Sequence, residues 1–187
     1  MAKAQRAIAT ENAVTVTISE KQRKGRAVNA VAELFMRKLL VPKVYLNPIA
    51  FRIDNIDVVA VDRAGSGDIH AASILGPYLV SGAFGKALNA LSEKAFNLVI
   101  RPSVENRDFH FQYVVVQPKF VDFLSKQNLF AEDGIGRVGI IEIIESPNAL
   151  PEARIAVPAE RFRVAPDKIK KFDNFQKKTA ADMEIRG

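Results

Sequence analysis

Apolar residues recur every three or four positions after Gly25, a spacing that gathers them on one side of a helix. Charged residues occupy positions between them, which makes the helix amphipathic. Pro42 limits the helix at its C-terminal end, because proline disfavours the helical conformation of the residue before it. The apolar stripe consists of Val28, Val31, Leu34, Phe35, Leu39 and Leu40.

Runs rich in β-branched residues follow this helix and are typical of strands. Residues 44–53, interrupted at Pro48, form the first run, and residues 56–61 and 69–75 form the second and third. The glycines and aspartates of the segment 62–68 favour a tight hairpin between the last two runs. We therefore expect an antiparallel meander of three strands directly after the helix.

The pattern returns to helical spacing after Gly76 and Pro77, and strands and helices then alternate. A strand, a helix and a strand at this spacing form a parallel crossover by preference. The sequence therefore predicts an α/β fold with a mixed central sheet flanked by helices on both faces. The predicted elements are a helix over 84–95, strands over 96–100, 109–116 and 138–144, and a short helix over 121–126.

Length and composition indicate a single domain. The chain has 187 residues, of which 48% are hydrophobic and 26% charged, and these values are ordinary for a globular domain. We expect a core over residues 24–145, an N-terminal arm over 1–23 and a proline-punctuated C-terminal extension over 146–187. Four apolar residues predict that part of the extension docks on the core as a short helix: Phe162, Ile169, Phe172 and Phe175.

Composition also excludes several kinds of chemistry. The sequence has no cysteine, which excludes disulfides, iron–sulfur clusters, thiolate zinc sites and a cysteine nucleophile. Its two histidines, His70 and His110, are too few for a histidine-rich metal site. The sequence has neither an apolar run of about 20 residues nor an apolar leader, so we expect a cytoplasmic protein without a membrane anchor.

Basic residues outnumber acidic ones, 27 against 21, which gives a formal net charge of +6. Such an excess is compatible with a polyanionic partner, DNA or RNA. Two basic stretches are the candidate phosphate contacts, and a solvated surface is the simpler interpretation of both. They contain Lys21, Arg23, Lys24 and Arg26 near the N-terminus and Lys168, Lys170 and Lys171 near the C-terminus.

The order of the predicted elements resembles that of a known superfamily. A helix, three meandering strands, and then helix, strand, helix and strand occur in this order in the PD-(D/E)xK nucleases, which share the restriction-endonuclease-like fold. The segment 56–72 is similar to the second and third strands of that fold with their hairpin, and the segment 134–141 is similar to its last core strand. The resemblance covers about residues 24–145 and implies a restriction-endonuclease-like mixed sheet.

The resemblance also implies where a nuclease site would lie. Such enzymes hold Mg²⁺ with carboxylates on adjacent strands and place a lysine beside them. Asp57 fits the acid of the second strand, and Glu33 fits the helix acid of many members. Ser73 and Leu75 stand where the acid and the lysine of the third strand belong. Because a hydroxyl is a poor magnesium ligand and a hydrocarbon cannot stabilise charge, the chain resembles a degenerate member with a remnant site.

Three functional interpretations follow. The first is a nuclease-fold protein that has lost catalysis, needs no cofactor and acts in nucleic-acid binding or as an assembly subunit. The second is a Mg²⁺-dependent endonuclease with a rearranged site, in which Lys86 or Lys94 supplies the lysine and Asp62 or Asp68 is recruited. The third is a structural protein–protein interaction subunit without nucleic acid, whose residues 146–187 wrap a partner.

Each candidate residue also has a structural interpretation. Asp57 precedes a strand, where backbone amides can satisfy it, and Glu33 can pair with Arg37 one helical turn later; as functional residues, the two acids are the candidate weak cation ligands. His70 lies in an apolar strand and is more typical of a core than of a ligand. His110 alternates with aromatic residues, which is typical of the inner face of a sheet, with base stacking as the alternative.

Overall fold

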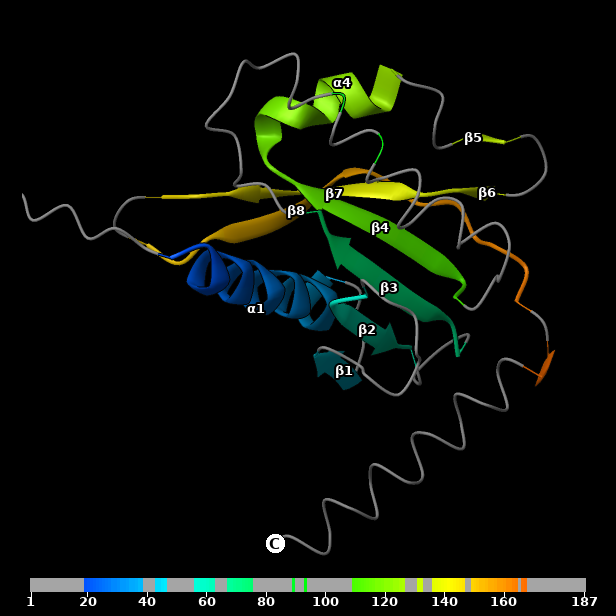
Figure 1. The fold of residues 1–187 in the computed structure, drawn as a ribbon. Coiled ribbons are helices and arrows are strands. Elements are labelled where there is room, and N and C mark those ends of the chain that lie inside the picture. The colour runs from blue at the N-terminus through cyan, green and yellow to red at the C-terminus, as the bar shows by residue number, and fades with distance from the viewer. Residues whose placement is uncertain are drawn as a thin grey trace, which may run out of the picture.

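The computed structural model describes residues 19–38, 43–46, 56–62, 67–75, 89, 93, 109–126, 131–132, 136–146, 149–164 and 166–167. Within these residues, six strands form one sheet in the order β1-β2-β3-β4-β7-β8, and β5 and β6 pair separately (Figure 1). The elements are α1 (Glu20–Lys38), β1 (Lys43–Leu46), β2 (Val58–Val61), β3 (Ile69–Ile74), β4 (Phe111–Val116), the 3-10 helix η3 (Pro118–Phe120), α4 (Val121–Lys126), β5 (Ala131–Glu132), β6 (Gly136–Arg137), β7 (Gly139–Ile144) and β8 (Glu152–Val157).

The large sheet is antiparallel towards both edges and parallel in its centre. The pairs β1–β2 and β2–β3 are antiparallel, β3–β4 and β4–β7 are parallel, and β7–β8 is antiparallel. This confirms the predicted α/β class, the mixed sheet and the meander. The hairpin after β2 closes with a 2.9 Å hydrogen bond from the Asp62 amide to the Asp68 carbonyl. Gly67 within it has φ +73°, a conformation that glycine adopts without steric cost.

Helix α1 begins at Glu20, earlier than the apolar pattern predicts. Its start is fixed by Ser19 and Gln22: the Gln22 amide donates to Ser19 Oγ at 3.3 Å, and the Ser19 amide donates to Gln22 Oε1 at 2.9 Å. This reciprocal cap supplies acceptors to amides near the start of the helix that would otherwise lack them. The first turns are polar, so a pattern built on apolar residues misses them, and the expected arm over 1–23 overlaps the helix.

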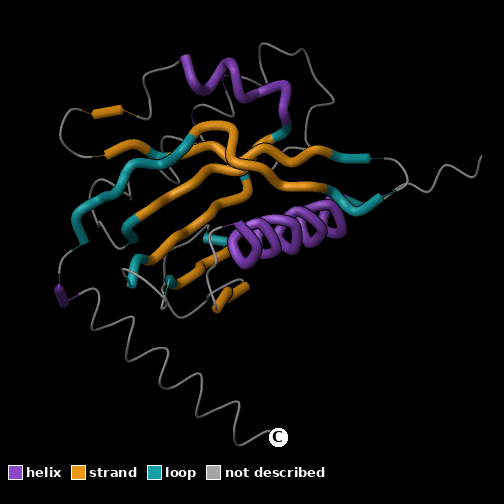
Figure 2. Tube along the Cα trace, turned by 180° about the vertical axis from the view of Figure 1, so that it is seen from behind, coloured by secondary structure: helices purple, strands orange, loops and turns teal. Residues whose placement is uncertain are grey.

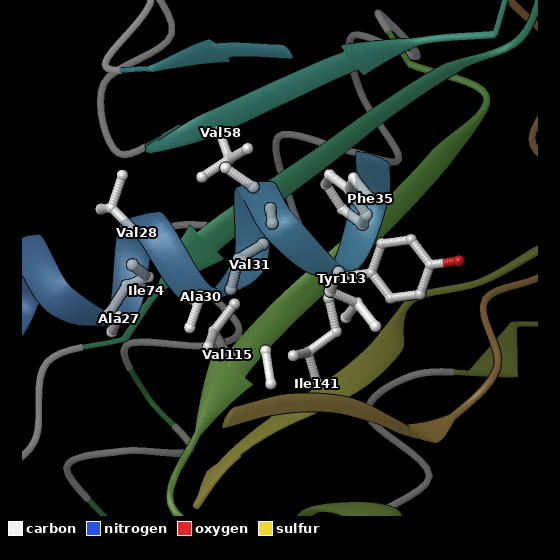
Figure 3. Packing of buried hydrophobic residues seen from close by; sticks show 14 of the residues in the cluster. Ala27, Val28, Ala30, Val31, Phe35, Val58, Ile74, Tyr113, Val115 and Ile141 are labelled. Carbon is white, nitrogen blue, oxygen red and sulfur yellow. The ribbon is translucent and has the colours of Figure 1, made fainter. Parts of the chain in front are cut away.

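One face of the sheet is covered by α1. Apolar side chains of the helix point into the sheet and form one buried cluster with strands β2, β3, β4 and β7 (Figure 3). Each fully buried valine, isoleucine or phenylalanine side chain contributes about 1.5–3 kcal/mol to the free energy of unfolding, so this contact holds the helix in place. The cluster includes Ala27, Val28, Val31, Phe35, Val58, Ile74, Tyr113, Val115 and Ile141.

The opposite face is covered by η3 and α4, which lie across the sheet from α1 (Figures 1 and 2). Phe120 and Leu124 of these helices pack with Val114 and Ile140 of the central strands. Helices therefore lie on both faces of the sheet, as predicted.

The stretch expected as a C-terminal extension contributes to the sheet. β8 pairs antiparallel with β7, and Ile155 lies opposite Ile141. Phe162, predicted to dock in a short helix, docks on the α4 side of the core with 1% of its surface exposed, but in a segment that is neither helix nor strand. The core thus reaches beyond residue 145. Pro151 and Pro158 flank β8. Because prolines are typical of loops, the sequence pattern did not indicate a strand here.

Some predicted elements lie outside the described residues. These are the apolar positions 39–40, the strand residues 49–53 and the strand 96–100. Of the helix predicted over 84–95, Asn89 and Glu93 are described, and both are helical.

Candidate functional site

Asp57 lies just before β2, at the end of the sheet where β3 finishes. Its side chain is only 7% exposed, and its Oδ2 accepts the Ile74 amide at 2.7 Å. Its own amide donates to the Ala72 carbonyl at 3.0 Å. The β2–β3 register pairs Val58 with Ala72, so one further step brings Asp57 level with Ser73. The carboxylate therefore extends the β2–β3 ladder, because it accepts the Ile74 amide in place of a backbone carbonyl of the neighbouring strand.

The second carboxylate oxygen of Asp57 is bound by a lysine from α1. Lys24 Nζ lies 2.7 Å from Asp57 Oδ1, and the Lys24 side chain is 48% exposed. Each oxygen therefore has its own donor, and an ammonium balances the charge. The sequence placed Lys24 among phosphate contacts and considered Lys86 or Lys94 for this position; those two lysines lie outside the described residues.

Ser73 and Leu75 are both buried, with 1% and 5% of their surfaces exposed. Leu75 belongs to the apolar cluster of Val114 and Phe120. Ser73 Oγ has no hydrogen-bond partner within the part of the chain that the structure describes. Both side chains lie in the core, and neither carries a charge that could hold or balance a metal ion.

Glu33 does not join Asp57. Its carboxylate pairs with Arg37 at 2.6 Å, the structural alternative expected from the sequence. Lys24, which reaches Asp57, precedes Glu33 on α1 by about 13.5 Å along the axis and by about half a turn around it. Glu33 therefore points away from Asp57 and lines a groove against the start of β8. The expected pair of weak cation ligands is not assembled.

The basic residues at the start of α1 do not form one strip. At about 100° per residue, Lys21 and Lys24 lie on one side of the helix, and Arg23 and Arg26 lie on another. Lys24 is paired with Asp57, and Arg26 Nη2 donates to the Ala149 carbonyl at 2.7 Å. The three lysines expected near the C-terminus, Lys168, Lys170 and Lys171, lie outside the described residues.

Charges balance over the described residues, which contain as many lysines and arginines as aspartates and glutamates. The whole excess of +6 therefore lies in the remaining segments of the sequence. Ion pairs also join basic side chains to acidic ones on the described surface, as Arg137 does with Glu160 at 2.6 Å and Arg154 with the buried Glu142.

A second polar cluster forms at the opposite end of β3. Asp68 Oδ1 accepts Arg161 Nε at 3.0 Å and Nη2 at 2.7 Å, and His110 Nε2 lies 3.6 Å from the same oxygen. His110 Nδ1 accepts the Ile69 amide at 3.0 Å. A ring nitrogen that accepts carries no proton, so these contacts assign the proton of neutral His110 to Nε2, facing Asp68. Burial lowers the pKa of His110 below 6.5, Asp68 opposes the shift, and Arg161 adds to it.

This cluster cannot complete a site at Asp57. β3 runs from Ile69 to Ile74, so Asp68 and Asp57 lie at opposite ends of a strand about 17 Å long. Asp68 is already engaged by Arg161, and His110 Nδ1 accepts the Ile69 amide while its Nε2 faces Asp68 at 3.6 Å. The arrangement links three segments of chain and provides no general base.

His70 is a core residue, as its apolar strand predicts. Its ring stacks on Phe111 at 4.6 Å, with Phe35 of α1 at 6.0 Å. Burial lowers its pKa from 6.5 to about 4, partly opposed by Asp68 and Asp62, so His70 is neutral at pH 7. Within the described residues its Nδ1 has no hydrogen-bond partner.

Two features of the described residues bear on cofactors and membranes. No group of three or more His, Asp or Glu side chains there is placed to hold a metal ion. No helix described is long and apolar enough to cross a membrane.

The fold and the site together define an α/β domain with a mixed sheet and a buried carboxylate bound to a lysine. No family model matches the chain, and comparison with curated proteins gives no match. Among solved structures, a protein of unknown function from Silicibacter pomeroyi is similar over 90% of this chain and 92% of its own, with 15% identity and a TM-score of 0.48. A likeness at this level carries no functional argument.

Sequence reasoning expected a backbone amide at Asp57, which the Ile74 amide provides, but it missed the charged side-chain partners of both aspartates. Lys24 and Asp57, like Asp68 and Arg161, are brought together only by the tertiary fold. The available signal was Lys24, one residue before the predicted start of the helix at Gly25.

Proposed function

We propose that this chain is a non-catalytic domain of restriction-endonuclease-like architecture that acts as a subunit of a protein assembly. One observation carries the loss of catalysis: the Asp57 carboxylate already has a donor at each oxygen, Lys24 and the Ile74 amide. A catalytic cation would have to displace the Lys24 ammonium. Ser73 and Leu75 offer no second carboxylate. The antiparallel meander followed by two parallel strands supports the architecture.

The surface supports a protein partner. A groove of about 380 Å³ runs between α1 and the start of β8, with Ala30, Leu34 and Ala153 among its lining residues. Leu150 at its edge is 79% exposed. Water contact with a large apolar side chain is unfavourable, and a partner that covers it gains about 25 cal/mol per Å² buried.

Loss of catalysis is tested with supercoiled plasmid and Mg²⁺ or Mn²⁺. We expect neither the wild-type chain nor Asp57→Ala to cut above a protein-free blank. Cutting by the wild-type chain that disappears in Asp57→Ala would overturn the proposal. Equal traces in both preparations would identify a contaminating nuclease.

Assembly is tested by size-exclusion chromatography with light scattering on the full chain. We expect the wild-type chain to have a mass above the 20.6 kDa of a single chain. The Leu150→Asp variant should have a lower mass, closer to 20.6 kDa. Ser125→Asp, an equal charge change at an exposed site on α4, serves as the matched control and keeps the wild-type mass. A monomer for all three chains at every concentration contradicts the proposal.

A second candidate function is nucleic-acid binding through the basic ends. It is supported by the formal net charge of +6 and by the lysines near the C-terminus. Phosphate contacts release counterions, so affinity for a short duplex should fall steeply between ~50 and ~200 mM salt. Replacement of Lys168, Lys170 and Lys171 by alanine should weaken binding and reduce the salt dependence. Absence of binding at low salt excludes this function.

A further inference from the structure

The C-terminal segment after β8 returns to the sheet beside the start of β4. At its near end, the Glu160 amide donates to the Arg137 carbonyl at 2.8 Å. At its far end, the Phe162 amide donates to the His110 carbonyl at 2.7 Å, and the Phe162 ring is buried. Arg161 between them binds Asp68. The segment is therefore held at two separate places, and only the second involves a histidine.

His110 joins three segments of chain at that second place. Its own amide donates to the Ile69 carbonyl at 2.9 Å, and its Nδ1 accepts the Ile69 amide at 3.0 Å. Its carbonyl holds the Phe162 amide. The ring can accept from Ile69 only while Nδ1 is unprotonated. Protonation turns that acceptor into a donor and leaves two N–H groups facing each other.

We propose that protonation of His110 releases residues 161–164 from the sheet, so that this residue acts as a pH-sensitive clamp on the C-terminal part of the chain. The clamp closes when His110 is neutral and opens when the ring is charged.

The charges around His110 set the direction of the response. Asp68, just before β3, attracts a charged ring, whereas Arg161 on the clamped segment repels it and competes for the same carboxylate oxygen. His70 of β3 is neutral in the range considered, and Asp62 at the end of β2 acts on His70. Phe35 of α1 packs against the His70 ring and brings no charge.

The sign of the pH dependence follows from burial. The folded pKa of His110 is lowered from 6.5, so the released state binds a proton more tightly than the clamped one. The clamp is at full strength above pH 6.5 and weakens as the pH falls towards the folded pKa.

The test is site-resolved amide exchange by NMR on the full chain at pH 7.5 and 5.0, corrected for the intrinsic rate. We expect the protection of the Ile69 and Phe162 amides to fall about tenfold at pH 5.0. The Glu160 amide, which binds the Arg137 carbonyl, should change by less than about twofold. Equal loss at all three amides would mean global destabilisation and would overturn the proposal.

Two variants isolate the ring of His110. In His110→Asn the side-chain carbonyl takes the place of Nδ1 and cannot be protonated, so Ile69 and Phe162 should keep their protection at pH 5.0. His70→Phe is the matched control: it flattens the global acid response, so Ile69 and Phe162 should still lose protection relative to Glu160 at pH 5.0. A tenfold loss that persists in His110→Asn refutes the role of this ring.

A direct titration covers the case in which His110→Asn does not fold. In the wild-type chain, the ring nitrogens of His110 should report the Nε2–H tautomer at pH 7.5 and titrate below pH 6.5. The Phe162 amide shift should follow the same midpoint. Titration at or above 6.5, or a Phe162 shift independent of it, overturns the proposal.

Discussion

Asp57 acts as a hydrogen-bond acceptor that stabilises the fold. Its Oδ2 satisfies a buried backbone amide of β3, and Oδ1 binds Lys24. A buried donor that loses a charged acceptor costs about 1.5–3 kcal/mol.

We therefore predict that Asp57→Ala lowers the free energy of unfolding by about 2–4 kcal/mol, because the Ile74 amide then has no acceptor. Asp57→Asn keeps a carbonyl oxygen for that amide and should lose only about half as much. Urea denaturation at pH 7 measures both. Equal losses in the two variants would mean that the charge, rather than the acceptor, is what the fold requires.

Gly139 is required by close packing at the start of β7. A methyl group there would lie 2.6 Å from the Ala159 amide nitrogen and 2.6 Å from Tyr113 Cδ1. Tyr113 pairs with Gly139 across the β4–β7 ladder, so its ring occupies the space that a side chain would need.

Gly139→Ala should lower the free energy of unfolding by about 1–3 kcal/mol, because the backbone at Ala159 must move. Gly25→Ala is the matched control: nothing lies within 4 Å of that position in α1, and alanine in a helix interior should stabilise by about 0.5–1 kcal/mol. Thermal unfolding of both variants gives the comparison. A neutral Gly139→Ala would show that the β4–β7 contact is loose.

At the scale of elements, the segment after β8 belongs to the core. Phe162 packs with Leu124 of α4 and Val114 of β4. A chain that stops near residue 146 would lack both β8 and this ring, so it is unsuitable for testing assembly.

Phe162→Ala should lower the free energy of unfolding by about 3–5 kcal/mol, since it leaves a large cavity between the sheet and α4. Leu150→Ala, at a side chain that is 79% exposed, should change it by less than about 0.5 kcal/mol. Denaturant midpoints measure the difference. Similar values would mean that the segment is only loosely docked.

The sequence predicted those elements whose burial repeats regularly. The apolar stripe of α1 and the β-branched runs of β2, β3 and β7 were identified because local periodicity reports which face is buried. β8 was missed because it is short, carries the charged residues Glu152 and Arg154, and lies between two prolines, features that an edge strand shares with a loop. The restriction-endonuclease-like assignment stays a prediction.

The candidate site was less predictable than the fold. The position of Asp57 beside Ser73 follows from strand order, which local patterns can give. The separation of Glu33 from Asp57 depends on which side of α1 faces the sheet. The ion pair between Asp68 and Arg161 depends on where the chain returns to the sheet after β8. Such contacts are set by tertiary packing, which leaves no local trace in the sequence.

At the scale of the whole molecule, the free energy of unfolding should fall at acidic pH because His70 is buried. Burial lowers its folded pKa to about 4, so the unfolded chain, with a pKa near 6.5, binds the proton more tightly. This contribution is fully present above pH 6.5 and is lost as the pH falls towards 4.

We predict that the wild-type chain loses stability of the order of 3 kcal/mol between pH 7 and 4 from this residue. His70→Phe should flatten that loss and raise stability at pH 7, because phenylalanine continues the stack on Phe111 without an unsatisfied nitrogen. Denaturation series at several pH values test this. An unchanged slope in His70→Phe would assign the acid sensitivity to other groups.

The flanking of β8 by Pro151 and Pro158 has a consequence for how copies of this chain could meet. Proline has no amide hydrogen to offer a neighbouring strand, so a ladder growing outward from this edge stops after a few residues. A neighbouring strand added here can therefore pair with no more than the six residues of β8, Glu152–Val157.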